Sequence, residues 1–326
     1  MPEVNREEWD SFFRSHTDAS FLQSPAWGDV KEEFGWEANR IIKGEAGAQI
    51  LIKRGPFGVS LGYMPKGPLG KITSDFIDTL NEKAKEMRLF LLTLEANLWE
   101  GDISSIPTRL EFKPGRNIQP RRTILISLEG SEEDWLNRMK QKTRYNIRLA
   151  QKKDVLVTET DDIDLFYKLM AATGSRDGFG IHSREYYQKV FNSFKPLGQC
   201  TILLAKFADQ ALGALMVLAN GNTAWYVYGA SNDFERNRMP TYLLQWEAMR
   251  WARKKGCKTY DLWGIPDEDE KELEDQFETR SDGLWGVYRF KRGFGGIVIR
   301  SAQAVDFVID KKIYAIYKRL PSRMRN

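Results

Sequence analysis

Cysteine and histidine are scarce in this chain, with two residues of each among 326. Cys200 and Cys257 are too few for a disulfide framework, and we expect both to be buried thiols in a reducing compartment. The histidines are His16 and His182, so the sequence predicts no multi-histidine metal site and offers few candidates for a Ser-His triad.

Long apolar runs and nucleotide-binding glycine patterns are also missing. Residues 1–18 are polar and acidic, so no signal peptide is visible, and no apolar run reaches the length of a membrane span. We therefore expect a cytoplasmic protein. Neither G-x-G-x-x-G nor a P-loop pattern occurs, so we expect no cofactor of the kinds that these motifs bind.

The composition is that of a folded, mildly basic protein. Hydrophobic residues make up 42% and charged residues 29%, and the length allows two domains that each have a core. A formal net charge of +4 permits polyanionic partners such as RNA, nucleotides or anionic lipid without requiring them.

Helix and strand signals in the first half follow one another at short intervals. Ser24 is a candidate N-cap and Pro25 a first-turn proline for a helix to about residue 34, in which Trp27 and Lys31 share a face. The pattern further predicts a helix at 6–14, strands at 48–54 and 57–63, a helix at 74–88 and strands at 89–94 and 123–128.

The best-marked helix is expected at residues 131–153, because Ser131 and Asp134 form a capping-box signature. Within it, cations recur every four residues and would form a basic ridge, at Lys140, Arg144, Arg148 and Lys152. Two interpretations stay open: an ordinary solvated surface, or a surface that contacts the phosphates of RNA or of a pyrophosphate lipid.

From residue 161 the order of elements resembles that of the first half. The pattern predicts helices at 161–173 and 185–194, strands at 200–207, 211–219 and 223–229, a helix at 241–255 and a strand at 258–263. Several strands follow one another before each helix, which indicates a largely antiparallel meander. We therefore expect two α/β domains of related plan.

Residues 285–296 alternate aromatic and cationic side chains, and we interpret them as a strand that leads into a β-prone run at 297–300. Alternation would place Phe290 and Lys291 on opposite faces. A lysine among aromatic residues can stabilise developing negative charge in a pocket of low dielectric. The alternative is a buried strand whose lysine extends to solvent.

A meander of strands followed by a helix and a further strand is reminiscent of the GNAT acyltransferases. In acetyl-CoA-dependent members a glycine-rich turn opens the helix, whereas residues 236–241 here contain no glycine. The whole chain resembles the Fem family of peptidoglycan aminoacyltransferases. The matching segments are 24–31 (SPAWGDVK), 63–68 (YMPKGP), 119–123 (QPRRT), 142–148 (KTRYNIR), 225–231 (WYVYGAS), 260–265 (YDLWGI) and 288–294 (YRFKRGF).

The resemblance implies two GNAT-like domains packed side by side, each a mixed, mostly antiparallel sheet flanked by helices. We place domain 1 at residues 1–130, completed by 304–326, and domain 2 at 131–303. Residues 267–282 are too short for the pair of long helices that FemA-type members carry, so the chain is FemX-like in build.

Roles carried over from the family fall on residues in both domains. Phe290 and Lys291 match the pair whose lysine stabilises the tetrahedral oxyanion, and Glu95 replaces an aspartate of the first-domain cleft as the candidate for proton handling. Lys31, or Asp29 in another alignment, matches a lysine that contacts the precursor's diphosphate. The other substrate-binding candidates are Trp27, Tyr63, Lys66, His182, Arg184, Tyr186, Tyr226 and Tyr228.

Some of these positions depart from the family pattern. The family arginine on the diphosphate falls at His182, with Arg184 two residues later, and either side chain can be cationic. Tyr186 matches a tyrosine of the precursor site, and Tyr226 and Tyr228 match aromatic residues that line the substrate cleft. For one of these two tyrosines a purely structural position in the strand is the alternative.

The activity that the resemblance implies is transfer of an amino acid from aminoacyl-tRNA to the stem peptide of a precursor, either lipid II or its UDP-linked form, without a cofactor. Such an ester is already activated, so positioning and oxyanion stabilisation suffice. The alternatives are an N-acyltransferase with another donor or acceptor, and a non-catalytic protein that binds precursor or RNA. The basic residues 311–325 are either a docked terminal helix or a contact to the inner face of an anionic membrane.

Overall fold

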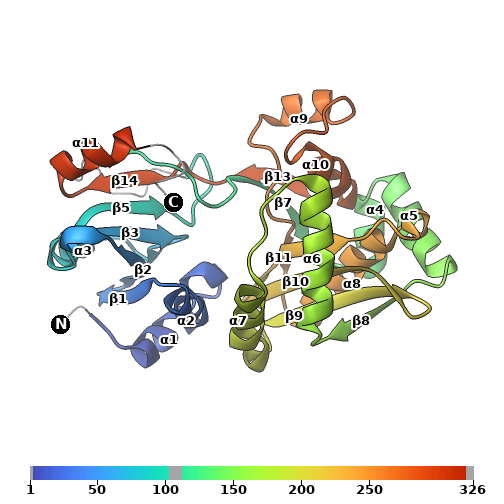
Figure 1. Cartoon of the computed structure of the whole chain (residues 1–326), viewed down its shortest axis with the longest axis horizontal. Coiled ribbons are helices and arrows are strands. Elements are labelled where there is room, and N and C mark those ends of the chain that lie inside the picture. Colours follow the sequence, from blue (N-terminus) through green and yellow to red (C-terminus); the bar gives the residue numbers. More distant parts are fainter. Residues whose placement is uncertain (1–2, 103–111, 321–326) are drawn as a thin grey trace. The chain divides into compact units, whose positions relative to one another are not determined.

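The computed structural model describes residues 3–102 and 112–320 of the chain, which divides into two compact units. Unit 1 is Met1–Arg121 with Arg300–Asn326, and unit 2 is Arg122–Ile299 (Figure 1). The C-terminal segment therefore returns to the first unit.

Unit 1 is built on one mixed sheet. Its helices are α1 (Arg6–Arg14), α2 (Pro25–Glu33), α3 (Ser74–Glu86) and α11 (Lys311–Arg319). Its strands are β1 (Glu37–Lys43), β2 (Ala46–Arg54), β3 (Ser60–Pro65), β4 (Leu69–Gly70), β5 (Leu89–Glu95), β6 (Phe112–Pro114) and β14 (Val305–Val308). The strand order is β1-β2-β3-β5-β14-β6, with β4 paired to β2.

Unit 2 has a second mixed sheet, of order β13-β7-β12-β11-β10-β9-β8. Its strands are β7 (Arg122–Ser127), β8 (Leu156–Thr160), β9 (Cys200–Phe207), β10 (Gln210–Asn220), β11 (Thr223–Ser231), β12 (Thr259–Asp261) and β13 (Ile297–Arg300). Its helices are α4 (Glu132–Arg138), α5 (Gln141–Lys152), α6 (Ile163–Asp177), α7 (Arg184–Phe194), α8 (Pro240–Lys254), α9 (Glu270–Gln276) and α10 (Trp285–Lys291).

The two sheets share one plan. In unit 1 the antiparallel meander β1-β2-β3 is followed by helix α3 and by β5, which is parallel to β3. In unit 2 the meander β9-β10-β11 is followed by α8 and by β12, which is parallel to β11. Two neighbouring parallel strands must be joined by a crossover connection, which is a helix in both units. The expectation of mixed, mostly antiparallel sheets flanked by helices is confirmed.

The local signals that begin helices act as predicted. Ser24 accepts a hydrogen bond from the N–H of Trp27, and Pro25 is in the first turn of α2. Ser131 and Asp134 form a capping box on α4. Cys200 and Cys257 are buried free thiols, and burial raises the pKa of Cys257 to about 11.

Residues 285–291 are a helix, so the prediction of a strand there is wrong. Trp285, Tyr288 and Lys291 are all buried, at a spacing of three residues. That spacing brings them to one side of a helix, whereas alternation along a strand would have separated them. A 3₁₀ turn, η6 (Arg292–Phe294), follows directly.

The helix expected at 131–153 is also interrupted, because Met139 and Lys140 adopt extended backbone conformations. The N–H of Lys140 donates to the carbonyl of Gly293 instead of continuing the helix, at 2.9 Å. The guanidinium of Arg144 donates to the carbonyls of Leu136 and Met139 at the end of α4. The predicted four-cation ridge is therefore wrong at Lys140 and Arg144, and Arg148 and Lys152 remain exposed on α5.

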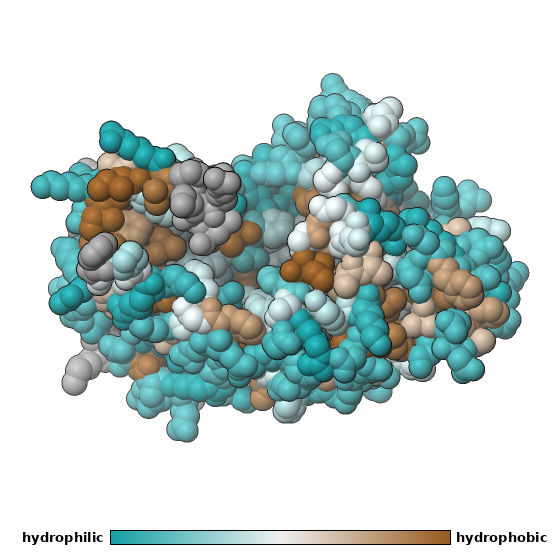
Figure 2. Space-filling view, in the orientation of Figure 1, coloured by the Kyte–Doolittle hydropathy of each residue, from teal (hydrophilic) through white to brown (hydrophobic). Residues whose placement is uncertain are grey.

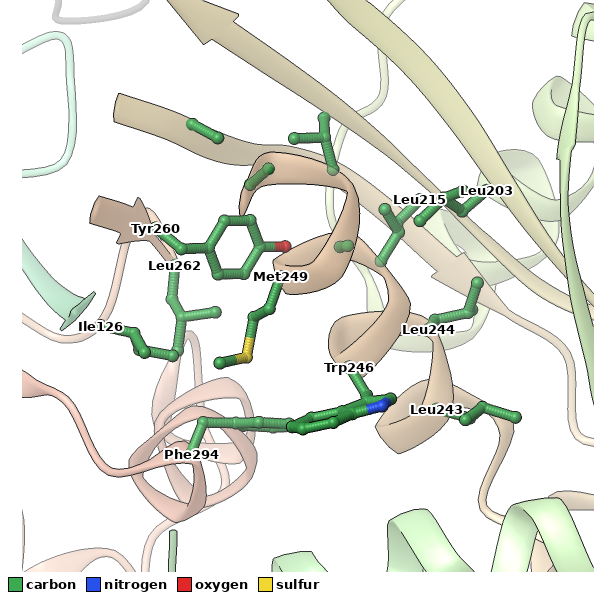
Figure 3. Packing of buried hydrophobic residues seen from close by; sticks show 14 of the residues in the cluster. Ile126, Leu203, Leu215, Leu243, Leu244, Trp246, Met249, Tyr260, Leu262 and Phe294 are labelled. Carbon is green, nitrogen blue, oxygen red and sulfur yellow. The ribbon is translucent and has the colours of Figure 1, made fainter. Parts of the chain in front are cut away.

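The largest core of unit 2 lies between α8 and the sheet (Figure 3). Leu243, Leu244, Trp246 and Met249 reach this core from α8. Phe294 of η6 enters the same cluster beside Trp246 and Met249. The aromatic ring thus anchors the residues that follow Lys291 to the most deeply buried part of the unit.

Among the described residues, none of the helices is both long enough and apolar enough to span a membrane.

Candidate active site

Lys291 is buried in unit 2, with its side chain 5% exposed. Its Nζ donates to the carbonyl of Gly264 at 2.8 Å and to that of Trp263 at 3.3 Å, and lies 5.4 Å from the ring centre of Tyr226. Burial lowers the pKa of Lys291 to about 7, and the negative charge of Asp261 opposes that shift. The amine can therefore exist in both protonation states near neutral pH.

A strained turn presents the two carbonyls to Lys291. Trp263 has a φ of 61°, a left-handed conformation that a bulky residue rarely adopts. Asp261, at the end of β12, holds the turn. Its carboxylate accepts hydrogen bonds from the N–H of Trp263, at 2.7 Å, and from the hydroxyl of Thr123. Thr123 also approaches the carbonyl of Trp263, at 3.2 Å.

Asp261 and Trp263 lie in the segment 260–265, for which the family resemblance implies no role for either residue. The local signal for Asp261 is a carboxylate that follows an apolar strand. The sequence also gives no signal for Gln245 of α8. Its side chain accepts a hydrogen bond from the hydroxyl of Tyr260 at 2.8 Å and forms another with Tyr226. Asp261, Gln245 and Tyr226 thus come from three different elements, β12, α8 and β11.

Tyr226 and Tyr228 point to opposite faces of the sheet. A β-bulge pairs Tyr226 with Val217 and Tyr228 with Met216, so Val227 is the extra residue. Tyr226 packs against the core beneath α8, whereas Tyr228 contacts Tyr187 of α7 at a ring distance of 5.0 Å. Tyr226 therefore belongs with Lys291, and Tyr228 belongs to a separate aromatic cluster.

That cluster contains two more of the predicted residues, His182 and Tyr186. Their rings stack at 4.0 Å, and His182 meets Tyr228 edge-on at 6.0 Å. Burial raises the pKa of Tyr186 to about 12. Arg184 is placed differently, because its partly exposed side chain forms an ion pair with Asp164.

Phe290 packs away from the amine of Lys291. Its ring contacts Tyr242 of α8 at 5.0 Å and Phe294 at 5.2 Å, both edge-on. This arrangement fixes α10 against α8, so the contacts of Phe290 are those of a residue that positions Lys291. Its assignment to the reaction itself stays a prediction.

In unit 1, Tyr63 and Glu95 lie together at the ends of the parallel strands β3 and β5. The hydroxyl of Tyr63 donates to Glu95, and the N–H groups of Ile118 and Gln119 donate to the other carboxylate oxygen. Burial raises the pKa of Glu95, and these hydrogen bonds oppose the shift. A carboxylate with three donors is better suited to holding the 118–119 loop than to accepting a proton.

The cations predicted to contact phosphate in unit 1 have aromatic neighbours. The ammonium of Lys31 lies 5.6 Å from the ring centre of Trp27 and 5.7 Å from that of Trp36. Burial lowers the pKa of Lys31, and Lys53 adds to that shift. Lys66 donates to Ser301 at 2.7 Å and lies 6.0 Å from the ring centre of Trp99.

In the other alignment, Asp29 takes the place of Lys31. Its carboxylate accepts a hydrogen bond from the guanidinium of Arg6 at 2.9 Å and lies 3.8 Å from the guanidinium of Arg40. Its carboxylate is therefore neutralised by cations of unit 1, and Lys31 is the better candidate for contact with a diphosphate.

Comparison with known proteins identifies the family of this chain. The model of the FemAB family matches residues 4–100, 110–209 and 202–321. The chain belongs to the FemAB family. Similar proteins include two named lipid II:glycine glycyltransferase, from Staphylococcus epidermidis and Staphylococcus aureus. Each is 22% identical over 98% of this chain, covering 95% and 96% of the relative's length. The prediction of a Fem-type aminoacyltransferase is confirmed at the level of family and enzyme class.

Solved structures agree on the fold. A crystal structure of FemX superposes with a TM-score of 0.84 at 21% identity, over 97% of this chain and 99% of that one. A tandem GNAT protein from the clavulanic acid pathway matches with a TM-score of 0.50 at 11% identity, over 94% and 98% of the two chains. The two-GNAT plan of this FemAB member is thereby confirmed.

The glycyltransferase alignments extend over 407 and 412 positions, more than the 326 residues of this chain. Those relatives therefore carry insertions that this FemAB member lacks. Between residues 267 and 282 it has the short helix α9 alone. The FemX-like build is confirmed.

Asp261 provides a test of the charge balance around Lys291. We expect Asp261→Asn to keep the hydrogen bond from Trp263 but to remove the negative charge that raises the pKa of Lys291. The amine would then lose its proton at lower pH, so the alkaline limb of the kcat–pH profile for transfer should move to lower pH. Asp275→Asn, at an exposed site on α9, is the matched control. An unmoved limb, or a shift to higher pH, would contradict this role.

Proposed function

We propose that this protein transfers an aminoacyl group from aminoacyl-tRNA to an amine on the stem peptide of a peptidoglycan precursor, and so forms the interpeptide bridge. The observation that carries the proposal is the buried amine of Lys291 in unit 2, which donates to two backbone carbonyls and lies beside the ring of Tyr226. The glycyltransferase names of the relatives support the same class of reaction.

In the proposed step, the acceptor amine attacks the carbonyl carbon of the aminoacyl ester. An amide bond forms, the ester bond breaks, and the ribose hydroxyl of the tRNA leaves with the proton that the amine loses. Lys291 in its cationic form stabilises the negative charge that develops on the carbonyl oxygen. The step needs no covalent enzyme intermediate.

We assign recognition of the precursor's phosphates within unit 1 to Lys31 and Lys66, and the roles of His182 and Arg184 in unit 2 stay predictions. Lys31 has its charge partly desolvated between two tryptophan rings, which strengthens its attraction to an anion. The ring of His182 is held by stacking on that of Tyr186. Arg184 is a weaker candidate because Asp164 already neutralises it.

Contact with a membrane surface stays a prediction. In α11, Tyr314 is buried against Phe90 and Leu91, so this helix is docked on unit 1, whereas Ile316 is 62% exposed. Figure 2 shows hydrophobic residues gathered on the α11–β14 side of that unit. Such a surface, with the exposed cations of α11, has the character of an interfacial contact. Residues 321–326 of the basic segment lie outside the described residues.

The helices that follow the meanders do not favour acyl-CoA as the donor. In unit 1 the hydroxyl of Thr73 accepts the N–H of Phe76 at the start of α3, and in unit 2 α8 begins with Pro240, which has no N–H. Neither start presents the glycine-rich turn that cradles a pyrophosphate.

The donor class can be tested with a pool of tRNAs charged with labelled amino acids. We expect label to enter either UDP-linked or lipid-linked precursor with the wild-type protein, and mild alkaline hydrolysis of the aminoacyl esters in the pool beforehand to abolish incorporation. Labelled acyl-CoA esters should give none. Incorporation from acyl-CoA but not from charged tRNA would overturn the proposal and favour an N-acyltransferase with another donor.

A further inference from the structure

Helix α5 carries positive charge only. Its cations are Lys142, Arg144, Arg148 and Lys152, and it contains no Asp or Glu. Thr143, Asn146, Ile147 and Ala150 form its buried side. At 100° per residue the exposed residues Tyr145, Arg148 and Lys152 share the outward side, with Lys142 beside them. We call these four residues the α5 face.

The cations of the α5 face have no acidic partner among residues 3–102 and 112–320. Within the described part of the chain, Lys142, Arg148 and Lys152 form no side-chain hydrogen bond or ion pair, unlike Arg184 with Asp164 or Arg250 with Glu132. Unpaired cations at neighbouring positions repel one another. A polyanion that bound along the helix would relieve that repulsion and release its own counterions.

The α5 face begins next to the segment that carries Lys291. The N–H of Lys140, the N-cap of α5, donates to the carbonyl of Gly293 at 2.9 Å. Gly293 is packed so closely that a Cβ there would lie 2.1 Å from the hydroxyl of Thr143. The twelve residues of α5 then extend about 18 Å from this point, enough to follow several phosphates of one strand.

The side chains of the α5 face fit RNA better than a bilayer. Tyr145 is 60% exposed and is the sole large hydrophobic residue of α5 that is exposed, so the helix offers no aliphatic residue to insert into lipid. An exposed aromatic ring among cations can instead stack on an unpaired base while the cations contact phosphates.

We propose that the α5 face is the docking surface for the acceptor end of the donor RNA, which it directs toward Lys291. This inference rests on the proposed function, since it requires an aminoacyl-RNA donor. It adds the part of the chain that binds the RNA beyond its reactive end, through contacts that do not depend on base sequence.

The test is a triple neutralisation of the α5 face, Lys142→Gln with Arg148→Gln and Lys152→Gln. We expect KM for charged tRNA to rise about tenfold or more at about 0.1 M salt, with kcat changed less than about twofold. The slope of log KM against log salt concentration should fall by about 2–3, close to one for each cation removed. A second variant, Tyr145→Ala, should raise KM without changing the salt slope.

A truncated donor separates docking from chemistry. An aminoacyl ester of the terminal dinucleotide reaches Lys291 but not the length of α5, so wild type and triple variant should use it equally well. The matched control is Arg253→Gln with Lys254→Gln and Lys258→Gln, three exposed cations at and beyond the far end of α8. This control should keep both KM and the salt slope. Thermal unfolding verifies that every variant is folded.

Each outcome has a distinct meaning. If wild type transfers nothing from charged tRNA or from the dinucleotide ester, the proposed function fails. If wild type uses charged tRNA and the triple variant keeps its KM and salt slope, the docking surface is overturned while the proposed function stands. If the triple variant instead loses binding to anionic vesicles with its tRNA kinetics intact, the α5 face is a membrane contact and the inference is wrong.

Discussion

Replacing Lys291 with methionine is expected to lower kcat for aminoacyl transfer by about 100- to 1,000-fold, the usual effect of removing one group that stabilises an oxyanion. Methionine fills a similar volume without a charge, so the packing around Tyr226 is retained. Because the lost interaction forms mainly in the transition state, the KM values for donor and acceptor should change far less than kcat.

Steady-state kinetics with charged tRNA and precursor measure this effect. Lys271→Met, at an exposed lysine on α9, is the control and should keep wild-type kcat. If Lys291→Met retains kcat within a few-fold, Lys291 does not stabilise the oxyanion. A rise in KM with unchanged kcat would assign it to uniform binding instead.

The same substitution is expected to change stability in a pH-dependent way. Burial lowers the pKa of Lys291 from 10.5 to about 7, so between these pH values the unfolded state binds more protons than the folded state. In this window the free energy of unfolding of wild type rises with pH. Relative to Lys291→Met, wild type therefore loses about 1.4 kcal/mol for each pH unit as pH falls, and about 4 kcal/mol in all by pH 7.

Denaturant unfolding of the two proteins between pH 6 and 10 measures this difference, and the contributions of the other titrating groups cancel. We expect the stability of wild type relative to Lys291→Met to decrease as pH falls toward 7 and to level off below it. The methionine leaves the carbonyls of Trp263 and Gly264 without their donor, which shifts the whole curve but not its slope. A gap independent of pH would show that the amine is not desolvated.

The order of helices and strands followed from local signals. Capping at Ser24 and Ser131 depends on residues within three positions, and the meanders and crossover helices have clear apolar periods. The errors occurred where tertiary contacts decide the backbone. The interruption at Lys140 depends on Gly293, which is 153 positions away, and no local pattern reports that hydrogen bond.

The site was predicted in part. Family resemblance named Lys291, and the structure gives the reason that its amine is unusual, namely burial beside a strained turn. Asp261, Trp263 and Gln245 could not be found, because their importance comes from contacts across the fold, of Asp261 and Trp263 with Lys291 and of Gln245 with Tyr226. Tyr226 and Tyr228 lie on opposite faces of the sheet because of one β-bulge, which moves every residue beyond it to the other face. The sequence carries no local signal for this bulge.

The measurement that tests the account most directly is tandem mass spectrometry of the precursor after incubation with the wild-type protein and charged tRNA. We expect a mass gain of one amino-acid residue, in an amide bond to an amine of the stem peptide, and its near-complete loss with Lys291→Met in the same time. An unmodified precursor with every charged tRNA, or the same product formed equally fast by Lys291→Met, would contradict the account.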